Sequence, residues 1–480
     1  MRRYRVLVVA VSVAAVCSAG GLAAAAAVPA AGSLGPAVPV PGLRALNVRG
    51  GAGVVSVSCA SAGNCVAGGH YQDARRRGQG FVASERHGRW GRATEVPGLG
   101  SLNAGGGADV LSVSCSSAGD CAAGGYYSWS VAYFRVAPFV VAERGGRWGK
   151  AVAVPKDGGV TSVSCASPGN CLAGGQGAGP DDYFNFGNAF LVQELAGRWG
   201  HVMAVPGMRA LKGGGDPESV GSWISSVACP SAGNCAVGGG YVDKHGGDHG
   251  WVADERGGVW GTAIEVPGLP ALDVGGGDTQ VSSMSCGSAG NCAAGGYYTD
   301  GDGHYQGFVA GEQDGTWGAA IEVPGLGALN AGERAAVNAV SCGSAGNCVA
   351  GGAYTDGGGH HQGFVADEQN GVWGTAAAVP GLAALGTGGA TFVTSVSCAS
   401  AGNCAAGGYY TDSSHHQGFA ASELNGKWGK AIAVPGLRHL NAGGPAEVGS
   451  LSCPSRGHCT AGGTFRGLSG HRQGYVTQSG

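Results

Sequence analysis

Cysteine, glutamate and histidine side chains recur at matching places along this chain, and they are the first candidates for its chemistry. Sixteen of the 17 cysteines form eight pairs, each with five residues between its members, and successive pairs start 50 to 64 residues apart. We expect eight disulfides, each closing one hairpin loop, because facing residues of paired strands lie at a bridgeable separation. The predicted disulfides join Cys59 to Cys65, Cys115 to Cys121, Cys165 to Cys171, Cys229 to Cys235, Cys286 to Cys292, Cys342 to Cys348, Cys398 to Cys404 and Cys453 to Cys459.

Zinc binding is the alternative interpretation of paired cysteines. Structural zinc sites favour two to four residues between paired ligands and need a second pair nearby. Five residues separate the cysteines here, so we predict disulfides, no metal and no other cofactor. Loops this short give each disulfide a chain-entropy stabilisation of roughly 2 kcal/mol.

One glutamate in each of seven units stands just before a predicted turn. Two carboxylates could hydrolyse a glycoside as acid and base, but those roles require different environments. Equivalent glutamates fit that requirement poorly, so we interpret them as acceptors that support the turn, and we favour a non-catalytic protein over an enzyme. These residues are Glu85, Glu143, Glu194, Glu255, Glu312, Glu368 and Glu423.

Histidines recur in the polar loops of the later units. Metal binding is one interpretation, but no carboxylate framework accompanies the histidines, so we expect hydrogen bonding within the loop. Asp300 and Asp302 resemble part of a calcium loop, yet the expected bidentate glutamate is missing. The histidines are His304, His360, His361, His415, His416 and His471.

Two of these loops depart from the repeat and are rich in aromatic residues. If they share one rim of the fold, aromatic rings beside Asp and Asn would form a platform for a carbohydrate or a peptide. The alternative is that the aromatic residues pack only against each other. The predicted ligand-binding residues are Tyr126, Tyr127, Trp129, Tyr133, Phe134, Asp181, Asp182, Tyr183 and Phe184.

Four short strands in each unit must position these side chains. The first is expected to end at the first cysteine, and the second to begin at the second cysteine after a five-residue loop. The third carries the Gly-Phe-Val-Ala-x-Glu segment, and a two-residue turn such as Asn370-Gly371 leads to a fourth that starts at Trp-Gly. The recurring Gly-Leu-x-Ala-Leu-Asn connector is expected to form a single helical turn.

Repeats of about 56 residues with four antiparallel strands predict an all-β protein with one β-propeller, in eight four-stranded blades or alternatively seven. The eighth unit lacks its Trp-Gly strand, and residues 37–47 match the end of that strand and its connector. We therefore expect the N-terminal strand to complete the C-terminal blade, which leaves no open sheet edge. An open solenoid is the alternative.

Residues 1–31 have the basic start, apolar run and small residues of a secretory signal peptide, so the propeller is assigned to residues 32–480. No later segment is apolar for long enough to predict a transmembrane anchor. Removal of the signal peptide leaves 25 basic against 31 acidic residues, which argues against nucleic acid as a partner. We expect a secreted protein, extracellular or associated with the cell wall.

The double glycine and the tryptophan of the repeat, as in Gly295-Gly296 and Trp317, resemble those of kelch-type blades. The turn followed by tryptophan resembles the Asp-box of sialidases without its full motif. Residues 37–480 as a whole are similar to secreted actinobacterial repeat proteins with Ser-Cys-x5-Cys-x-Ala-Gly-Gly and Trp-Gly motifs. These resemblances imply a propeller and specify no activity.

The predicted function is a non-catalytic binding module for a glycan or a protein at the cell envelope, monomeric by default. A sialidase-like glycoside hydrolase or lyase and a purely structural wall component are the alternatives.

Overall fold

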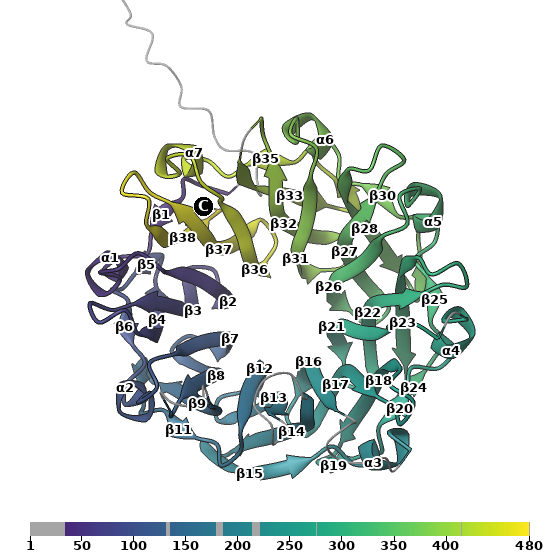
Figure 1. The fold of residues 1–480 in the computed structure, drawn as a ribbon, viewed down its shortest axis with the longest axis horizontal. Helices are drawn as coiled ribbons and strands as arrows, with labels where there is room; N and C mark the ends of the chain where they lie inside the picture. The colour runs from purple at the N-terminus through teal and green to yellow at the C-terminus, as the bar shows by residue number, and fades with distance from the viewer. Residues whose placement is uncertain are drawn as a thin grey trace, which may run out of the picture. The chain divides into compact units, whose positions relative to one another are not determined.

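Eight antiparallel sheets surround one axis and form a β-propeller (Figure 1). The computed structural model describes residues 34–130, 135–178, 186–213, 221–274, 276–413 and 415–479, which belong to one compact unit, Ala31–Gly480. The sheets are called blades 1 to 8 in chain order, and the strands of each are called a to d from the centre outward. The prediction of eight blades is confirmed, and the seven-bladed and solenoid alternatives are wrong.

Strands a and b are the inner pair of every blade, and they run past the cysteines to a two-residue turn such as Ala62-Gly63. The predicted five-residue loop is therefore wrong, since the paired cysteines face each other within the ladder. The a strands are β2 (Gly53–Ser61), β7 (Ala108–Ser117), β12 (Gly158–Ser167), β16 (Ser222–Ser231), β21 (Gln280–Ser288), β26 (Ala335–Ser344), β31 (Thr391–Ser400) and β36 (Glu447–Ser455). The b strands are β3 (Asn64–Gln72), β8 (Asp120–Ser128), β13 (Asn170–Ala178), β17 (Asn234–Val242), β22 (Asn291–Thr299), β27 (Asn347–Thr355), β32 (Asn403–Thr411) and β37 (His458–Arg466).

All eight predicted disulfides are present, one in each blade, with Cα atoms 3.9 to 4.1 Å apart. Each disulfide joins strands a and b of its own blade, so it supports one hairpin and links no two blades. Disulfides of this number are typical of proteins that fold in an oxidising, extracellular-type environment.

The c strands carry the repeated glutamates and turn into strand d through two residues with positive φ, such as Asn370 (52°) and Gly371 (81°). These are the type I′ conformations that the Asn-Gly sequence predicts. The c strands are β4 (Gly78–Arg86), β9 (Val136–Arg144), β14 (Phe186–Leu195), β18 (Asp248–Arg256), β23 (Tyr305–Gln313), β28 (His361–Gln369), β33 (His416–Leu424) and β38 (Arg472–Gln478).

Strand d is divided into two short pieces in six blades, and one extra residue bulges out between the pieces after the Trp-Gly step. The pieces are β5 (Arg89–Trp90) and β6 (Thr94–Glu95), β10 (Arg147–Trp148) and β11 (Val152–Ala153), β19 (Val259–Trp260) and β20 (Ile264–Glu265), β24 (Thr316–Trp317) and β25 (Ile321–Glu322), β29 (Val372–Trp373) and β30 (Ala377–Ala378), and β34 (Lys427–Trp428) and β35 (Ile432–Ala433). Blade 3 has the single strand β15 (Arg198–Ala204).

The N-terminal strand β1 (Val38–Pro39) completes blade 8, with Val38 opposite Val476 and Pro39 opposite Tyr475. This pairing closes the ring as the two incomplete ends of the repeat predict. Leu34 and Ala37 pack into the apolar cluster between blades 7 and 8. The last blade is therefore built from both ends of the described chain.

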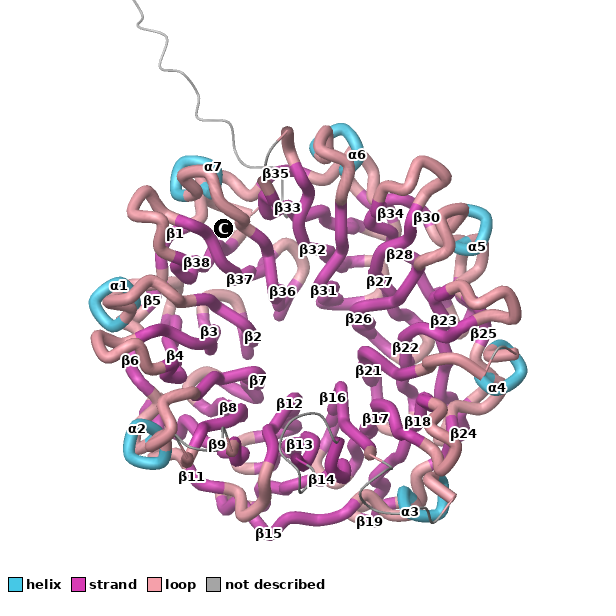
Figure 2. Tube along the Cα trace, in the orientation of Figure 1, coloured by secondary structure: helices cyan, strands magenta, loops and turns pink. Residues whose placement is uncertain are grey.

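In the described part of the chain, seven single-turn helices connect strand d to the next strand a and lie at the outer edge of the ring (Figure 2). They confirm the predicted helical turn, and each begins with a buried Leu or Met after a glycine with positive φ, as at Gly325 (74°). The helices are α1 (Leu43–Leu46), α2 (Leu99–Leu102), α3 (Met208–Leu211), α4 (Leu269–Leu272), α5 (Leu326–Leu329), α6 (Leu382–Leu385) and α7 (Leu437–Leu440).

The apolar core lies between neighbouring blades, and the double glycine permits the close approach. A Cβ on Gly295 would stand 2.6 Å from a methyl group of Val337 in the next blade, and one on Gly296 would stand 1.9 Å from the carbonyl oxygen of Gln280. The first glycine therefore admits the valine of the next blade, and the second lets strand a of its own blade bend inward.

The serines before the first cysteine join the a strands of adjacent blades. The Oγ atoms of Ser56 and Ser58 accept the backbone N–H groups of Val113 and Cys115 at 3.1 and 3.0 Å. The same contact closes the ring, because Ser450 of blade 8 accepts the N–H of Val57 in blade 1. The repeated Ser-x-Ser-Cys sequence thus has a structural role between blades.

Among the described residues, no helix is long and apolar enough to cross a membrane.

Candidate functional site

Three of the predicted ligand-binding residues lie in the described part of blade 2, at the b to c end of β8. Trp129 is 45% exposed, Tyr126 is half-buried and Tyr127 is 8% exposed within the apolar core. Burial raises the pKa of the Tyr126 phenol above its usual range, and Asp109 raises it further. Tyr133, Phe134, Asp181, Asp182, Tyr183 and Phe184 lie outside the described residues. The aromatic platform therefore stays a prediction, to which Trp129 and Tyr126 can present side-chain surface.

Tyr126 belongs to a ring of eight cross-strand pairs in which the residue type changes from blade to blade. We call these positions the variable pairs, and their side chains include acidic, aromatic, amide and aliphatic groups. They are Gly53 with His70, Asp109 with Tyr126, Gly159 with Gln176, Trp223 with Gly240, Gln280 with Tyr297, Ala336 with Ala353, Phe392 with Tyr409, and Glu447 with Thr464.

The next pair along the same two strands is almost constant. A buried Val or Ile on strand a faces a glycine on strand b in every blade, as Val110 faces Gly125 and Ile224 faces Gly239. Adjacent residue pairs on strands a and b thus differ: one pair packs between blades and keeps its residue types, and the next pair varies in residue type from blade to blade. Because the a strands surround the centre of the ring, the variable pairs form a circle there, near the b to c ends of the strands (Figure 1).

Side chains of the variable pairs contact neighbouring blades. Phe392 stacks on Tyr409 with ring centroids 5.0 Å apart, and its ring also lies 4.9 Å from that of His361 in blade 6. Between blades 1 and 2, Nδ1 of His70 lies 3.0 Å from a carboxylate oxygen of Asp109. The circle therefore combines aromatic faces with charged groups.

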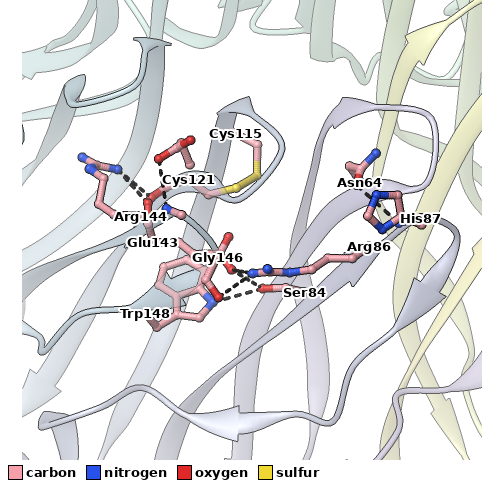
Figure 3. Close-up of polar contacts among 12 residues, drawn as sticks. Asn64, Ser84, Arg86, His87, Cys115, Cys121, Glu143, Arg144, Gly146 and Trp148 are labelled. Atoms are coloured by element: carbon pink, nitrogen blue, oxygen red, sulfur yellow. Dashed lines mark hydrogen bonds and ion pairs between the residues drawn. A yellow bond between two sulfur atoms is a disulfide. The ribbon is translucent and has the colours of Figure 1, made fainter.

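The interpretation of the repeated glutamates as acceptors that support the turn is wrong for Glu143, Glu194, Glu255 and Glu312, which bond to the preceding blade. Oε1 of Glu143 accepts hydrogen bonds from Ser84 at 2.9 Å and Arg86 at 2.8 Å, both in blade 1 (Figure 3). Glu194 pairs with Arg144, and Glu255 accepts the amide of Gln193 at 3.0 Å. The c to d turn is instead supported by the first residue of strand b, since Oδ1 of Asn291 accepts the N–H of Asp314.

The tryptophan of strand d also reaches the preceding blade, at the residue before the glutamate. Its indole Nε1 donates to Ser84 from Trp148, to Asp254 from Trp317 and to Asp367 from Trp428, at 2.9 to 3.1 Å. The indole nitrogens of Trp199, Trp260 and Trp373 have no partner among the described residues; the corresponding residues of the preceding blades are Ala142, Gln193 and Gly311. In several repeats the Trp or the Glu therefore contacts the end of the previous c strand.

Asp300, Asp302 and His304 form the one described group whose three potential metal-binding atoms lie within 4.8 Å of one another. Oδ1 of Asp300 already accepts the backbone N–H groups of Asp302 and His304 at 3.0 and 2.9 Å. Asp356 accepts two backbone N–H groups in the same way in blade 6, without the second aspartate. This aspartate therefore has a loop-forming role in both blades.

The fold and the contacts between blades define a β-propeller, and the comparisons with known proteins agree with that class. No protein-family model and no curated protein sequence matches the chain. Among solved structures, Sqt1 from Chaetomium thermophilum is similar with a TM-score of 0.50 and 12% identity, over 90% of this chain and 97% of that one. The WD40 propeller domain of Doa1 has a TM-score of 0.39 and 12% identity, over 78% of this chain and 93% of that one.

Sialidases are also among the structural neighbours. The Trypanosoma rangeli sialidase in complex with sialic acid has a TM-score of 0.38 and 9% identity, over 93% of this chain and 57% of that one. Likeness at these identities shows the propeller fold and nothing about activity.

Proposed function

We propose that this chain is a secreted, non-catalytic β-propeller that binds a glycan or a protein at the cell envelope through the variable pairs. The observation that supports the proposal is the variety of side chains in this circle, directly beside Val-Gly or Ile-Gly pairs that are constant from blade to blade. Packing positions need the same residue in every blade, whereas a recognition surface needs different side chains at different points. The circle has that property.

The side chains available suit a polar ligand with flat apolar faces. Trp129 and Phe392 can cover the faces of sugar rings or apolar side chains, and Asp109 and Glu447 can accept hydrogen bonds from hydroxyl or amide groups. Aromatic groups beside a few convergent polar groups are typical of such sites.

The repeated glutamates favour a binding role over hydrolysis. Each sits at an equivalent buried position between blades, and several are bonded to the preceding blade. A glycoside hydrolase needs two carboxylates with different tasks on either side of one bond. Secretion is part of this proposal because residues 1–31 match the pattern of a signal peptide. The resemblance of the repeat to kelch-type and actinobacterial repeat proteins is also part of the proposal.

The test is a binding screen of the mature protein on an immobilised glycan panel that includes peptidoglycan fragments, with a cell-envelope protein extract as the second arm. We expect Trp129→Ala and Phe392→Ala to weaken the binding found by at least about tenfold, as hot-spot aromatics do. Val259→Ala, at a 71% exposed residue beside a c to d turn, is the matched control and should bind as the wild type does. Unchanged binding by Phe392→Ala would refute the role of the circle, and unchanged binding by Trp129→Ala would refute a role for the aromatic loop beside it. Turnover of a glycoside would refute the non-catalytic assignment.

A further inference from the structure

The opposite ends of the strands, where the a to b and c to d turns lie, carry an arginine site at several junctions between blades. Between blades 4 and 5, Arg256 donates to Oε1 of Glu312 at 2.8 Å and to the carbonyl oxygen of Gly315. Between blades 1 and 2, Arg86 donates in the same way to Glu143 and to the carbonyl of Gly146 (Figure 3). A carboxylate from the c strand and a carbonyl from the following turn thus bind one guanidinium group.

The junction between blades 6 and 7 keeps both acceptors but has lost the arginine. Gln369 stands where blade 4 has Arg256, while Glu423 and Gly426 correspond to Glu312 and Gly315. Among the described residues, no atom lies within 4 Å of the place where a Cβ of Gly426 would be, whereas the guanidinium of Arg256 occupies that place at Gly315. Gln369 therefore does not replace the missing group.

The pockets at the two junctions, one with Arg256 and one with Gln369, differ in volume. The pocket at the junction of blades 4 and 5 measures about 10 Å³, and Arg256 and Glu312 line it. The equivalent pocket between blades 6 and 7 measures about 260 Å³ and is lined by Asp367, Glu423 and Gly426 among others. The two junctions are otherwise alike, because an aspartate before the c-strand glutamate bonds the next tryptophan in each. The smaller pocket is therefore at the junction that has the arginine, and the larger pocket is at the junction that lacks it.

The larger pocket contains a buried carboxylate without a partner. Glu423 is 2% exposed, and its Oε2 has no hydrogen-bond partner among the described residues. Burial and, to a smaller extent, the neighbouring Asp367 carboxylate together raise the pKa of Glu423 to about 7. The remaining polar side chains along the pocket are the carboxylate of Glu368 and the neutral amides of Asn347, Gln369, Asn370 and Asn425. The pocket thus presents acceptors and negative charge without a cation.

We propose that the pocket between blades 6 and 7 binds a guanidinium group supplied from outside the chain, at Glu423 and the carbonyl of Gly426. The chain shows the required geometry twice, with Arg86 and Arg256 as the internal ligands. A planar group with several N–H donors can reach a carboxylate and a carbonyl together, which a single ammonium does less well. Among the described residues no third metal-type ligand atom joins Asp367 and Glu423, so a metal ion fits the pocket less well.

The neighbouring junction of blades 5 and 6 is a different case. Gln313 follows the glutamate there too, but its amide nitrogen lies over Gly371, in the place that arginine takes elsewhere. The residue before its glutamate is Gly311, which offers no second carboxylate. We therefore assign the guanidinium site to blades 6 and 7 rather than to blades 5 and 6.

The test is calorimetric titration of the mature protein at pH 8 with three probes: methylguanidinium, N-acetyl-arginine methylamide and N-acetyl-lysine methylamide. We expect both guanidinium compounds to bind with one site per chain, and the lysine compound to bind at least about tenfold more weakly, because it lacks the fork of donors. Binding of the arginine compound well above methylguanidinium would identify a protein side chain as the source. Equal binding would identify a small guanidinium compound.

Reciprocal variants test the location. Gln369→Arg should remove binding by placing a guanidinium in the pocket, and Arg256→Gln should create a second site between blades 4 and 5. Glu423→Gln should also remove binding, and the exposed Val372→Ala is the control that should keep it. The proposal is wrong if no guanidinium probe binds, if lysine binds equally, or if Gln369→Arg binds as the wild type does. These outcomes are independent of the circle of variable pairs, which lies at the other ends of the strands.

Discussion

The junctions between blades 4 and 5 and between blades 6 and 7 are built from the same parts and differ at one central position. In both, an aspartate bonds the tryptophan of the next blade, and a buried glutamate lies beside the glycine of the next turn. Arg256 neutralises the first glutamate, whereas Gln369 leaves the second without a cation and leaves a pocket of about 260 Å³. In a repeat protein, a single exchange can therefore convert a structural contact into a binding site without altering the fold.

The largest effect is expected from removing the arginine. Arg256→Leu leaves Glu312 buried without its partner, which should lower the free energy of unfolding at pH 8 by roughly 2–4 kcal/mol. Gln369→Leu removes no such partner and should change it by less than about 0.5 kcal/mol. Chemical denaturation of the two variants measures the difference, and equal losses would show that Arg256 has no special role.

A smaller, pH-dependent effect is expected at Glu423. Its folded pKa of about 7 lies above the ordinary value near 4.5, so the folded state holds the proton longer than the unfolded state does. Stability should therefore fall as pH rises from about 4.5 to 7 and then level off. Glu423→Gln should gain about 1–3 kcal/mol at pH 8 and nothing at pH 4.5.

Glu312→Gln is the comparison variant for this pH effect. Burial raises the pKa of Glu312 to about 7 as well, but that substitution also discards the bond to Arg256. Its gain at pH 8 should be smaller than that of Glu423→Gln. The free energies of unfolding of the wild type and of Glu423→Gln are compared between pH 4.5 and pH 8. If the two change with pH by the same amount, the raised pKa does not belong to Glu423.

The serine contacts give the smallest expected effect, and each of the two junctions lacks one of them, at a different position of the repeat. Ala228 and Ala339 stand where other blades have a serine that accepts a backbone N–H group of the next blade. Ala228→Ser and Ala339→Ser should each add about 0.5–1 kcal/mol, the usual net value of one hydrogen bond. Thermal unfolding measures the gain, and Ala339→Val, without a hydroxyl, should show none.

Much of this architecture follows from patterns within one repeat. The Cys-x5-Cys spacing, the Asn-Gly turns and the two incomplete ends predicted the disulfides, the type I′ hairpins and the closure by β1, since each depends on residues that are close in sequence or on counting strands. The position of the variable pairs and the surroundings of Trp129 could not be predicted, because they depend on the register of the paired strands. Most of the predicted aromatic loop residues lie outside the described residues.

The roles of the glutamates and serines were missed because their partners lie in another blade. Arg86 and Glu143 are 57 residues apart, so no local pattern shows that they meet. A signal was present nonetheless. The residue after the glutamate is arginine at Arg86, Arg144 and Arg256, glutamine at Gln313 and Gln369, and leucine at Leu195 and Leu424. This variation can be interpreted only when the contact of each side chain with the next blade is known.

A crystal structure of the wild-type protein with N-acetyl-arginine methylamide tests the account of the two junctions most directly. We expect its guanidinium between blades 6 and 7, bonded to Glu423 and the carbonyl of Gly426, and none between blades 4 and 5, where Arg256 already lies. A ligand bound only elsewhere, or a pocket that closes over Glu423 with Gln369 in place of the guanidinium, would contradict it.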